Sequence, residues 1–151
     1  MPAFRFKLEF LLSLRKKREE EAALKLAKRL ASVRELENKL SAIADSRQKL
    51  SEDVSLRSRE GTLTPPLIAL YGEYQAKLLQ DAKKAQELLN LSLREKAKEQ
   101  AALQKAAMER QLMEKIKEKK AVAHKTAELY QEQIILEEMA SLVRDRKFRN
   151  A

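Results

Sequence analysis

Few residues in this sequence have side chains that could perform acid–base or metal chemistry. His124 is the single histidine, it lies in a lysine-rich stretch, and the chain has no cysteine. A metal site needs several ligands at short spacing, so we expect His124 to be a solvated surface residue. Acidic pairs such as Glu137 and Glu138 are likewise expected on a solvated helix surface.

Motifs for phosphate binding, nucleophilic attack and cofactor binding are also missing. The sequence has only two glycines, and neither belongs to a glycine-rich phosphate loop or a nucleophile elbow. We therefore expect a protein that is not an enzyme and that holds no metal and no cofactor.

The composition predicts long helices as the elements that carry these residues. Charged residues make up 36% of the chain, aromatic residues 5%, and there are three prolines. This usage is typical of long helices or coiled coils, and it supplies too few large apolar side chains for a thick core. The lack of cysteine excludes disulfides and fits a reducing compartment.

The net charge of +9 favours an acidic partner, which can be a protein face, an anionic membrane or a nucleic acid. No segment has the length and flanks of a signal peptide, and none reaches the length of a membrane span. The expectation is a cytosolic protein that does not insert into the membrane.

Residues 61–66, Gly-Thr-Leu-Thr-Pro-Pro, form the one strong interruption of the helical pattern. Gly61 is expected to end a first helix over about 7–59, since glycine often follows a helix C-terminus. Thr64 followed by Pro65 is a typical N-cap and first helical residue. We therefore predict a turn over residues 60–66 and a second helix over about 66–146.

Apolar residues in steps of three and four predict a seam, the stripe along which the two helices meet. On the first helix the seam is Leu26, Leu30, Val33, Leu36, Leu40, Ile43, Arg47, Leu50 and Val54. On the second it begins Leu67, Tyr71, Tyr74, Leu78, Ala82, Ala85 and Leu89. One antiparallel register pairs Val54 with Tyr71 and Leu36 with Leu89. This predicts an all-α fold, a long antiparallel two-helix coiled-coil hairpin in a single domain over 1–151.

The same register makes the second helix longer than the first. Leu8 lies opposite Lys117, so residues after about Glu118 are predicted to form a C-terminal helix overhang without a partner. Its apolar residues recur at seven-residue spacing: Val122, Leu129, Leu136 and Val143. We interpret the overhang as a binding element, with a frayed tail as the alternative.

Aromatic residues gather at the ends of the two helices, which makes each end a candidate contact site. They are Phe4, Phe6, Phe10, Tyr71, Tyr74, Tyr130 and Phe148. Local packing is the alternative for each group, and residues 1–6 are expected to fray.

Residues 4–15, Phe-Arg-Phe-Lys-Leu-Glu-Phe-Leu-Leu-Ser-Leu-Arg, resemble the N-terminus of the flagellar export protein FliJ family. The resemblance continues in residues 70–78, an aromatic start of the second helix, and in residues 132–140, an acidic C-terminal motif. Glu137 departs from that motif, which has Asp at this position.

The resemblance implies a soluble, non-catalytic stalk of the flagellar type III export apparatus, similar to the gamma subunit of rotary ATPases. Such a stalk inserts its helix ends into the hexameric export ATPase ring. It touches the export gate, a membrane protein, nearer the hairpin corner, and it escorts export chaperones. The expected location is cytoplasmic, peripheral at the cytoplasmic face of the inner membrane.

The resemblance also implies two sets of contact residues. Those for the ATPase are Phe6, Leu8, Leu11, Leu12, Arg15, Leu129, Leu136, Glu138 and Met139. Those for the export gate are Ile43, Ser46, Leu50, Tyr74 and Leu78. Ile43 and Leu78 also belong to the predicted seam, which must then be shallow.

Three alternatives remain at the level of sequence. One is the equivalent stalk of a virulence type III secretion system. Another is a basic coiled coil that binds an anionic membrane or nucleic acid, although acidic residues interrupt every basic stripe. The last is a structural coiled coil in which two chains pair. We expect a monomeric hairpin that does not bind nucleic acid.

Overall fold

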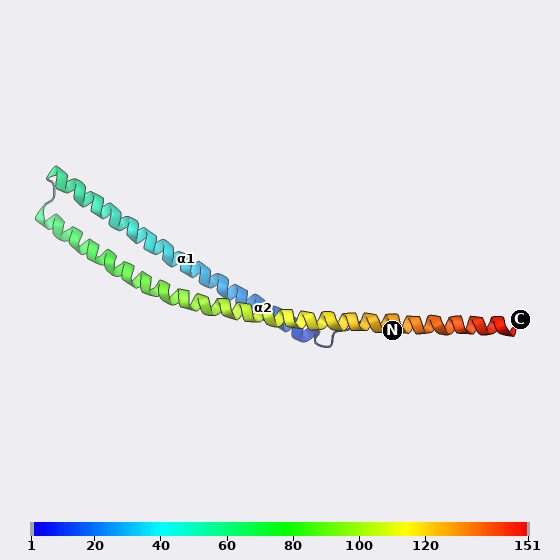
Figure 1. Cartoon of the computed structure of the whole chain (residues 1–151). Coiled ribbons are helices and arrows are strands. Elements are labelled where there is room, and N and C mark those ends of the chain that lie inside the picture. Colours follow the sequence, from blue (N-terminus) through cyan, green and yellow to red (C-terminus); the bar gives the residue numbers. More distant parts are fainter. Residues whose placement is uncertain (1, 151) are drawn as a thin grey trace. The chain divides into compact units, whose positions relative to one another are not determined.

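The computed structural model of the protein describes residues 2–150. It contains two helices, α1 (Glu9–Glu60) and α2 (Pro65–Arg149), and no strand in that range (Figure 1). The two helices pack against each other, which confirms the predicted all-α helical hairpin. Their predicted bounds differ from the observed ones by at most three residues at each end.

The corner, residues 61–64, has the predicted chemistry at both helix ends. Gly61 has a positive φ of 71°, a conformation that glycine adopts without the steric cost of a Cβ. The Thr62 N–H then donates to the Arg57 carbonyl at 3.0 Å, which is the hydrogen bond of a Schellman motif. On the other side, the Thr64 carbonyl accepts from the Ile68 N–H at 2.9 Å. Gly61 therefore ends α1, and Thr64 is the N-cap of α2.

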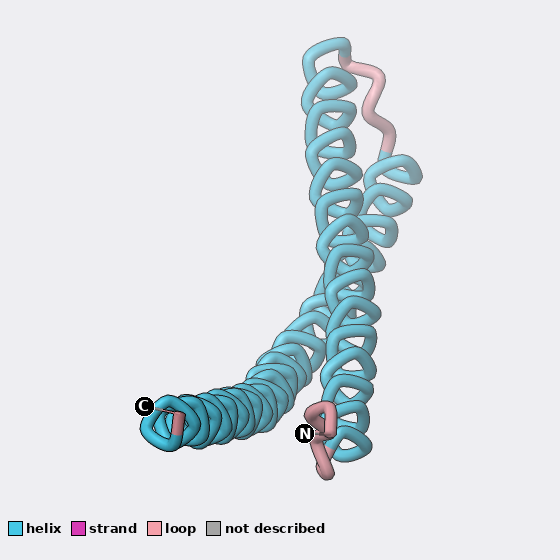
Figure 2. The backbone as a smooth tube through the Cα atoms, turned by 90° about the vertical axis from the view of Figure 1, so that its right-hand side faces the viewer, coloured by secondary structure: helices cyan, strands magenta, loops and turns pink. Residues whose placement is uncertain are grey.

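Outside the helices the structure has a short stretch before α1, the corner between the helices, and Asn150 after α2 (Figure 2). The stretch before α1 is anchored rather than frayed, because Phe6 within it is buried. Its backbone joins the helix through a hydrogen bond of 3.1 Å from the Glu9 N–H to the Phe6 carbonyl. The expectation that this stretch frays is therefore wrong at Phe6.

The contacts of the chain group into two compact units. The first unit combines the residues up to Glu20 with those from Lys105 onward, and the second covers Glu21–Gln104. Each contains part of both helices.

The Glu21–Gln104 unit contains most of the predicted seam. Its buried apolar residues are Val33, Leu78, Ala85 and Leu89. The small Ala85 beside larger side chains allows the helices to approach closely. The prediction is wrong at Leu30, Arg47 and Tyr74, which are exposed.

At Leu30 the apolar seam is interrupted, because a pair of charged residues lies between the helices there. Arg29 is half-buried and its guanidinium lies 3.2 Å from the carboxylate of Glu99, which is itself buried. A buried carboxylate requires a charged partner, so this pair fixes the rotation of both helices. Near the corner Ser46, rather than Arg47, is the half-buried residue.

In the other unit a small apolar core joins the N-terminal segment to α2. Phe6, Leu12 and Met113 are buried in it, and Phe4, Leu11 and Ile116 pack against them. Within the described residues, neither helix is long and apolar enough to cross a membrane.

The two glycines predict opposite effects of alanine. Gly61→Ala should lower the free energy of unfolding by about 1 kcal/mol, because a Cβ is strained at positive φ. Gly72→Ala should raise it by about 1 kcal/mol, because Gly72 lies in α2 and a Cβ there meets no atom within 4 Å. Thermal unfolding followed by circular dichroism measures both. Equal effects of the two variants would contradict these assignments.

Candidate interaction surfaces

The N-terminal segment, residues 2–8, packs on α2 and contributes to a local core. Leu12, at the start of α1, is only 1% exposed and contacts this core. The ring centroid of Phe4 lies 5.7 Å from that of His124, with the ring planes tilted by 53°. His124 is therefore half-buried against an aromatic ring, and the prediction of a solvated histidine is wrong.

Ion pairs between α1 and α2 extend this core along the helices. Arg15 lies 2.6 Å from Glu109, and Glu9 lies 2.8 Å from Lys117. These pairs also fix the antiparallel register, because a shift of either helix would separate the charges.

Arg110 is the most highly bonded side chain of this region. Its guanidinium donates to the carboxylates of Glu19 and Glu114, the latter at 2.7 Å. The hydrogen bond to Glu19, followed by that to Glu114, raises the pKa of Arg110. Arg110 therefore joins α1 to α2 and also stabilises α2 itself.

The N-terminal segment lengthens the paired part of α2 beyond the predicted limit at Glu118. Half-buried residues continue through His124 to Glu128. From residue 129 onward every described residue is exposed. The overhang is thus shorter than predicted, and from here on the name denotes residues 129–149.

The overhang has a broader apolar surface than the predicted stripe. Leu129, Leu136 and Val143 are exposed as predicted, and Leu136 is 65% exposed. Met139 and Phe148, which were predicted as contact residues, are also exposed, and two further exposed residues were missed: Ile135 and Leu142. Ile135 and Leu142 are seven residues apart, directly beside Leu136 and Val143. Their spacing could have revealed a second row on the same helix.

The residues predicted to contact the ATPase divide into two groups in the structure. Phe6 and Leu12 are buried in the local core, Leu11 is half-buried, and the Arg15 guanidinium already binds Glu109. These four residues stabilise the N-terminal end. Leu8, Leu129, Leu136, Glu138 and Met139 are exposed. Phe10 was missed in this prediction, although it is 82% exposed.

The residues predicted to contact the export gate lie along the Glu21–Gln104 unit near the corner. Leu78 is buried in the seam, and Ile43, Ser46 and Leu50 are half-buried. Tyr74 is 46% exposed, which makes it the most accessible member of the set. A buried Leu78 supports the seam beneath such a surface rather than forming part of it.

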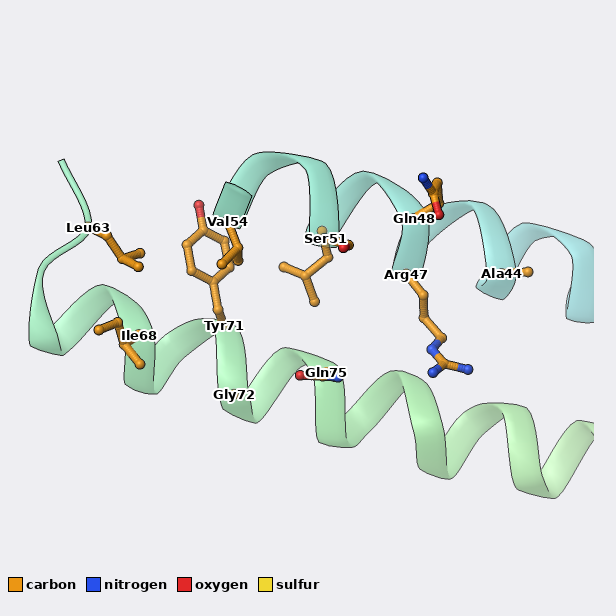
Figure 3. A pocket seen from close by; sticks show the side chains of 11 residues that line it. Ala44, Arg47, Gln48, Ser51, Val54, Leu63, Ile68, Tyr71, Gly72 and Gln75 are labelled. Atoms are coloured by element: carbon orange, nitrogen blue, oxygen red, sulfur yellow. The ribbon is translucent and has the colours of Figure 1, made fainter. Parts of the chain in front are cut away.

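Beside Leu50, the same unit contains a groove of about 700 Å³ between the two helices (Figure 3). Tyr71 bridges the groove, and its hydroxyl donates to the Asp53 carboxylate. This hydrogen bond is the main cause that raises the pKa of Tyr71. Among the described residues, no group of three or more histidine, cysteine or acidic side chains could hold a metal ion.

The arrangement, two unequal helices with an exposed helical end, agrees with one comparison with known proteins. The family model of the flagellar FliJ protein matches residues 4–147. The chain belongs to the FliJ family. Comparisons with curated proteins and with solved structures found no match. FliJ proteins are non-catalytic components of the flagellar type III export apparatus. Membership of this family supports the interpretation of the chain as a stalk-like protein of that apparatus.

The local core predicts different effects for two neighbouring apolar residues. Leu12→Ala should lower the free energy of unfolding by about 3 kcal/mol, because it opens a cavity beside Phe6 and Met113. Phe10→Ala should change it by less than about 0.5 kcal/mol, since Phe10 is exposed. Thermal unfolding followed by circular dichroism compares them. A destabilised Phe10→Ala variant with an unaffected Leu12→Ala variant would contradict this packing.

Proposed function

We propose that this FliJ-family chain is a stalk of the flagellar type III export apparatus whose overhang inserts into the hexameric export ATPase ring. The observation that supports this most directly is the overhang itself. It is a helix of about 30 Å in which every residue is exposed and large apolar residues recur. Exposure of these apolar side chains to water is unfavourable, and a partner that buries them removes this free-energy cost.

The chemistry of the overhang suits a protein partner better than nucleic acid or an anionic membrane. Acidic residues occupy its first half, with Glu132, Glu137 and Glu138, and most basic residues follow after position 143. A uniformly basic face, which phosphate binding requires, does not form. The acidic first half and the basic end of the overhang instead favour contacts with a protein surface that carries both charges.

The N-terminal end contributes to the same proposed contact. Leu8 and Phe10 are exposed beside the local core that anchors α1 to α2. Exposed aromatic and leucine side chains on a rigid support are efficient interface anchors, because little side-chain entropy is lost on binding. Such a contact is asymmetric and would favour one conformation of a single ATPase subunit. This would promote assembly of the ring or hydrolysis of ATP.

The corner end of the hairpin is proposed to contact the export gate. Tyr74 supplies an exposed aromatic side chain there, and Leu50 is one of the residues that line the groove. This arrangement would link a cytoplasmic ATPase to a membrane protein and hold the stalk at the cytoplasmic face of the inner membrane. Export chaperones are further proposed partners, which the exposed leucines of α2 could contact.

The overhang can be tested with a double substitution. Leu136→Ala combined with Met139→Ala should weaken binding to the export ATPase about tenfold or more, since two central apolar contacts are lost. Stimulation of ATP hydrolysis at limiting stalk concentration should fall with it. Titration of the purified ATPase with the stalk, followed by phosphate release, measures both.

The matched control is Leu91→Ala combined with Met108→Ala. Both residues are exposed on α2 outside the overhang, so this variant should stimulate normally. A chain shortened after Glu128 retains the described local core. Normal stimulation by that shortened chain would show that the overhang does not contact the ATPase.

The gate contact can be tested at Tyr74. Tyr74→Ala should weaken binding to the cytoplasmic part of the export gate about tenfold, because an exposed aromatic anchor is removed. Its stimulation of the ATPase should stay unchanged. Tyr130→Ala, which removes an exposed tyrosine of the overhang, is the control and should leave gate binding unchanged. Loss of gate binding in both variants would contradict the division into two ends.

A further inference from the structure

The overhang continues the side of α2 on which the N-terminal segment packs. Ala121 and Glu128 are half-buried on that side, and Ile135 and Leu142 follow them at the same seven-residue spacing. Residues seven apart lie close to one line along a helix, so these four residues form one row. α2 is a single helix through Arg149 (Figure 1). The row therefore passes from half-buried to exposed without leaving the covered side of the helix.

Apolar side chains form a coiled-coil seam on this side of the overhang. Its central positions are 129, 132, 136, 139, 143 and 146, in steps of three and four, which is the spacing of helices that pack along their length. Tyr130, Ile134 and Phe148 lie on other sides of the helix. We call the seam and the row beside it the overhang face. Its apolar members, all exposed, are Leu129, Ile135, Leu136, Met139, Leu142 and Val143.

The overhang face has acidic residues at its start and basic residues at its end. Glu128 and Glu132 lie at the end nearer the local core, and Arg146 and Arg149 lie at the other end, bordered by Lys147. The other charged residues of the overhang lie on the remaining sides of the helix: Glu137, Glu138, Arg144 and Asp145. Such a face is complementary to a second copy of itself that runs in the opposite direction.

The order of these charges distinguishes the two ways in which a second copy can pair. In a parallel pair in register, Glu132 would lie beside the partner's Glu132, and Arg146 beside the partner's Arg146. Both residues occupy central positions of the seam, where like charges repel each other strongly. In an antiparallel pair, Glu132 instead lies within one helical turn of the partner's Arg146, and the opposite charges attract. The charges therefore favour the antiparallel pair.

We propose that two copies of this chain pair antiparallel through their overhang faces, with Leu136 packed against the partner's Met139. In this register Ile135 lies against the partner's Leu142, and two-fold symmetry forms each contact twice. Arg149 of the partner subunit then lies beside Glu128, the last half-buried residue before the overhang. The pair thus occupies the length of α2 that the N-terminal segment leaves exposed. The paired form replaces the expectation of a monomeric hairpin.

Pairing would cover residues that the proposed ATPase contact uses. Leu136 and Met139 lie at the centre of the pair, and one helix face can pack against only one partner at a time. The paired stalk would therefore have to dissociate before its overhang enters the ATPase ring. This consequence rests on the proposed function, whereas the pairing is a property of the chain alone.

The test measures the mass of the purified full chain by sedimentation velocity over a range of concentrations. The unmodified chain should pass from monomer to dimer as its concentration rises. Glu132→Arg should raise the dissociation constant of the dimer about tenfold or more, because like charges then meet at both ends of the pair. Arg146→Glu should have the same effect for the same reason. An unmodified chain that is still monomeric at about 1 mM would overturn the proposal.

Combining Glu132→Arg with Arg146→Glu tests the direction of the pair. The doubly substituted chain again brings opposite charges together in an antiparallel pair. Its dissociation constant should therefore return to within about threefold of that of the unmodified chain. In a parallel pair each position would face its own copy in every variant, so neither the single nor the double substitutions would change the dissociation constant. That result would overturn the antiparallel arrangement.

Matched control variants carry the same charge changes on another side of the overhang. Glu137→Arg and Arg144→Glu alter exposed residues outside the overhang face, and both variants should dimerise like the unmodified chain. Circular dichroism of every variant checks that the helices are intact. Equal weakening by Glu137→Arg would mean that only net charge matters. Either that result or an unchanged dimer in all variants would overturn pairing through the overhang face.

Introduced cysteines test the register, because the chain has none of its own. A Leu136→Cys chain is mixed with a Met139→Cys chain under mild oxidation. The disulfide between the two different chains should form in preference to either disulfide between identical chains, since only these two positions face each other in the proposed pair. A predominance of disulfides between identical chains would overturn the register.

Discussion

The narrowness of a two-helix interface is the constraint on which the rest of this structure depends. Two helices can cover only one stripe of each other, so a helix in such a pair keeps most of its circumference in water. The buried residues are accordingly few: in the Glu21–Gln104 unit the apolar ones are Val33, Leu78, Ala85 and Leu89. So few buried apolar residues fix the register of the two helices only weakly. Charged pairs such as Arg29 with Glu99 add to the definition of that register. The remaining large apolar residues face water, where a partner can bury them.

Because the two helices differ in length, the narrow interface leaves one end of α2 without a partner helix. α1 has 52 residues and α2 has 85, so α2 must extend beyond the pairing. The N-terminal segment covers part of the difference by packing Phe4 and Phe6 on α2. The remaining overhang stays fully exposed. In the proposed function this stalk would need no catalytic residue of its own, because it would act by binding the proposed ATPase at one end and the proposed gate at the other.

Residues that a sequence motif groups together serve different purposes in the structure. The aromatic N-terminal motif contains the buried Phe6, which lies in the segment before α1, and the exposed Phe10, which lies in the first turn of α1. Near the corner Leu78 is buried, whereas Tyr74, about one helical turn before it, is exposed. A residue's place in a motif therefore does not tell whether its side chain is buried beneath a surface or exposed on it. Phe10 was named among the aromatic residues at the helix ends but was left out of the predicted ATPase contacts.

The sequence by itself determined the helices, the corner, the antiparallel register and the unequal lengths. These features depend on local signals, namely Gly61, Thr64 and Pro65 at the corner and the three-to-four spacing of apolar residues along each helix. The family resemblance was also visible in three short stretches, and the match over residues 4–147 confirmed it. Only the tertiary structure decided that His124 is half-buried by Phe4, that Arg29 rather than Leu30 lies in the seam, and that Ser46 rather than Arg47 is half-buried near the corner. Each depends on which atoms of the opposite helix lie nearby, and helical spacing alone contains no information about those neighbours.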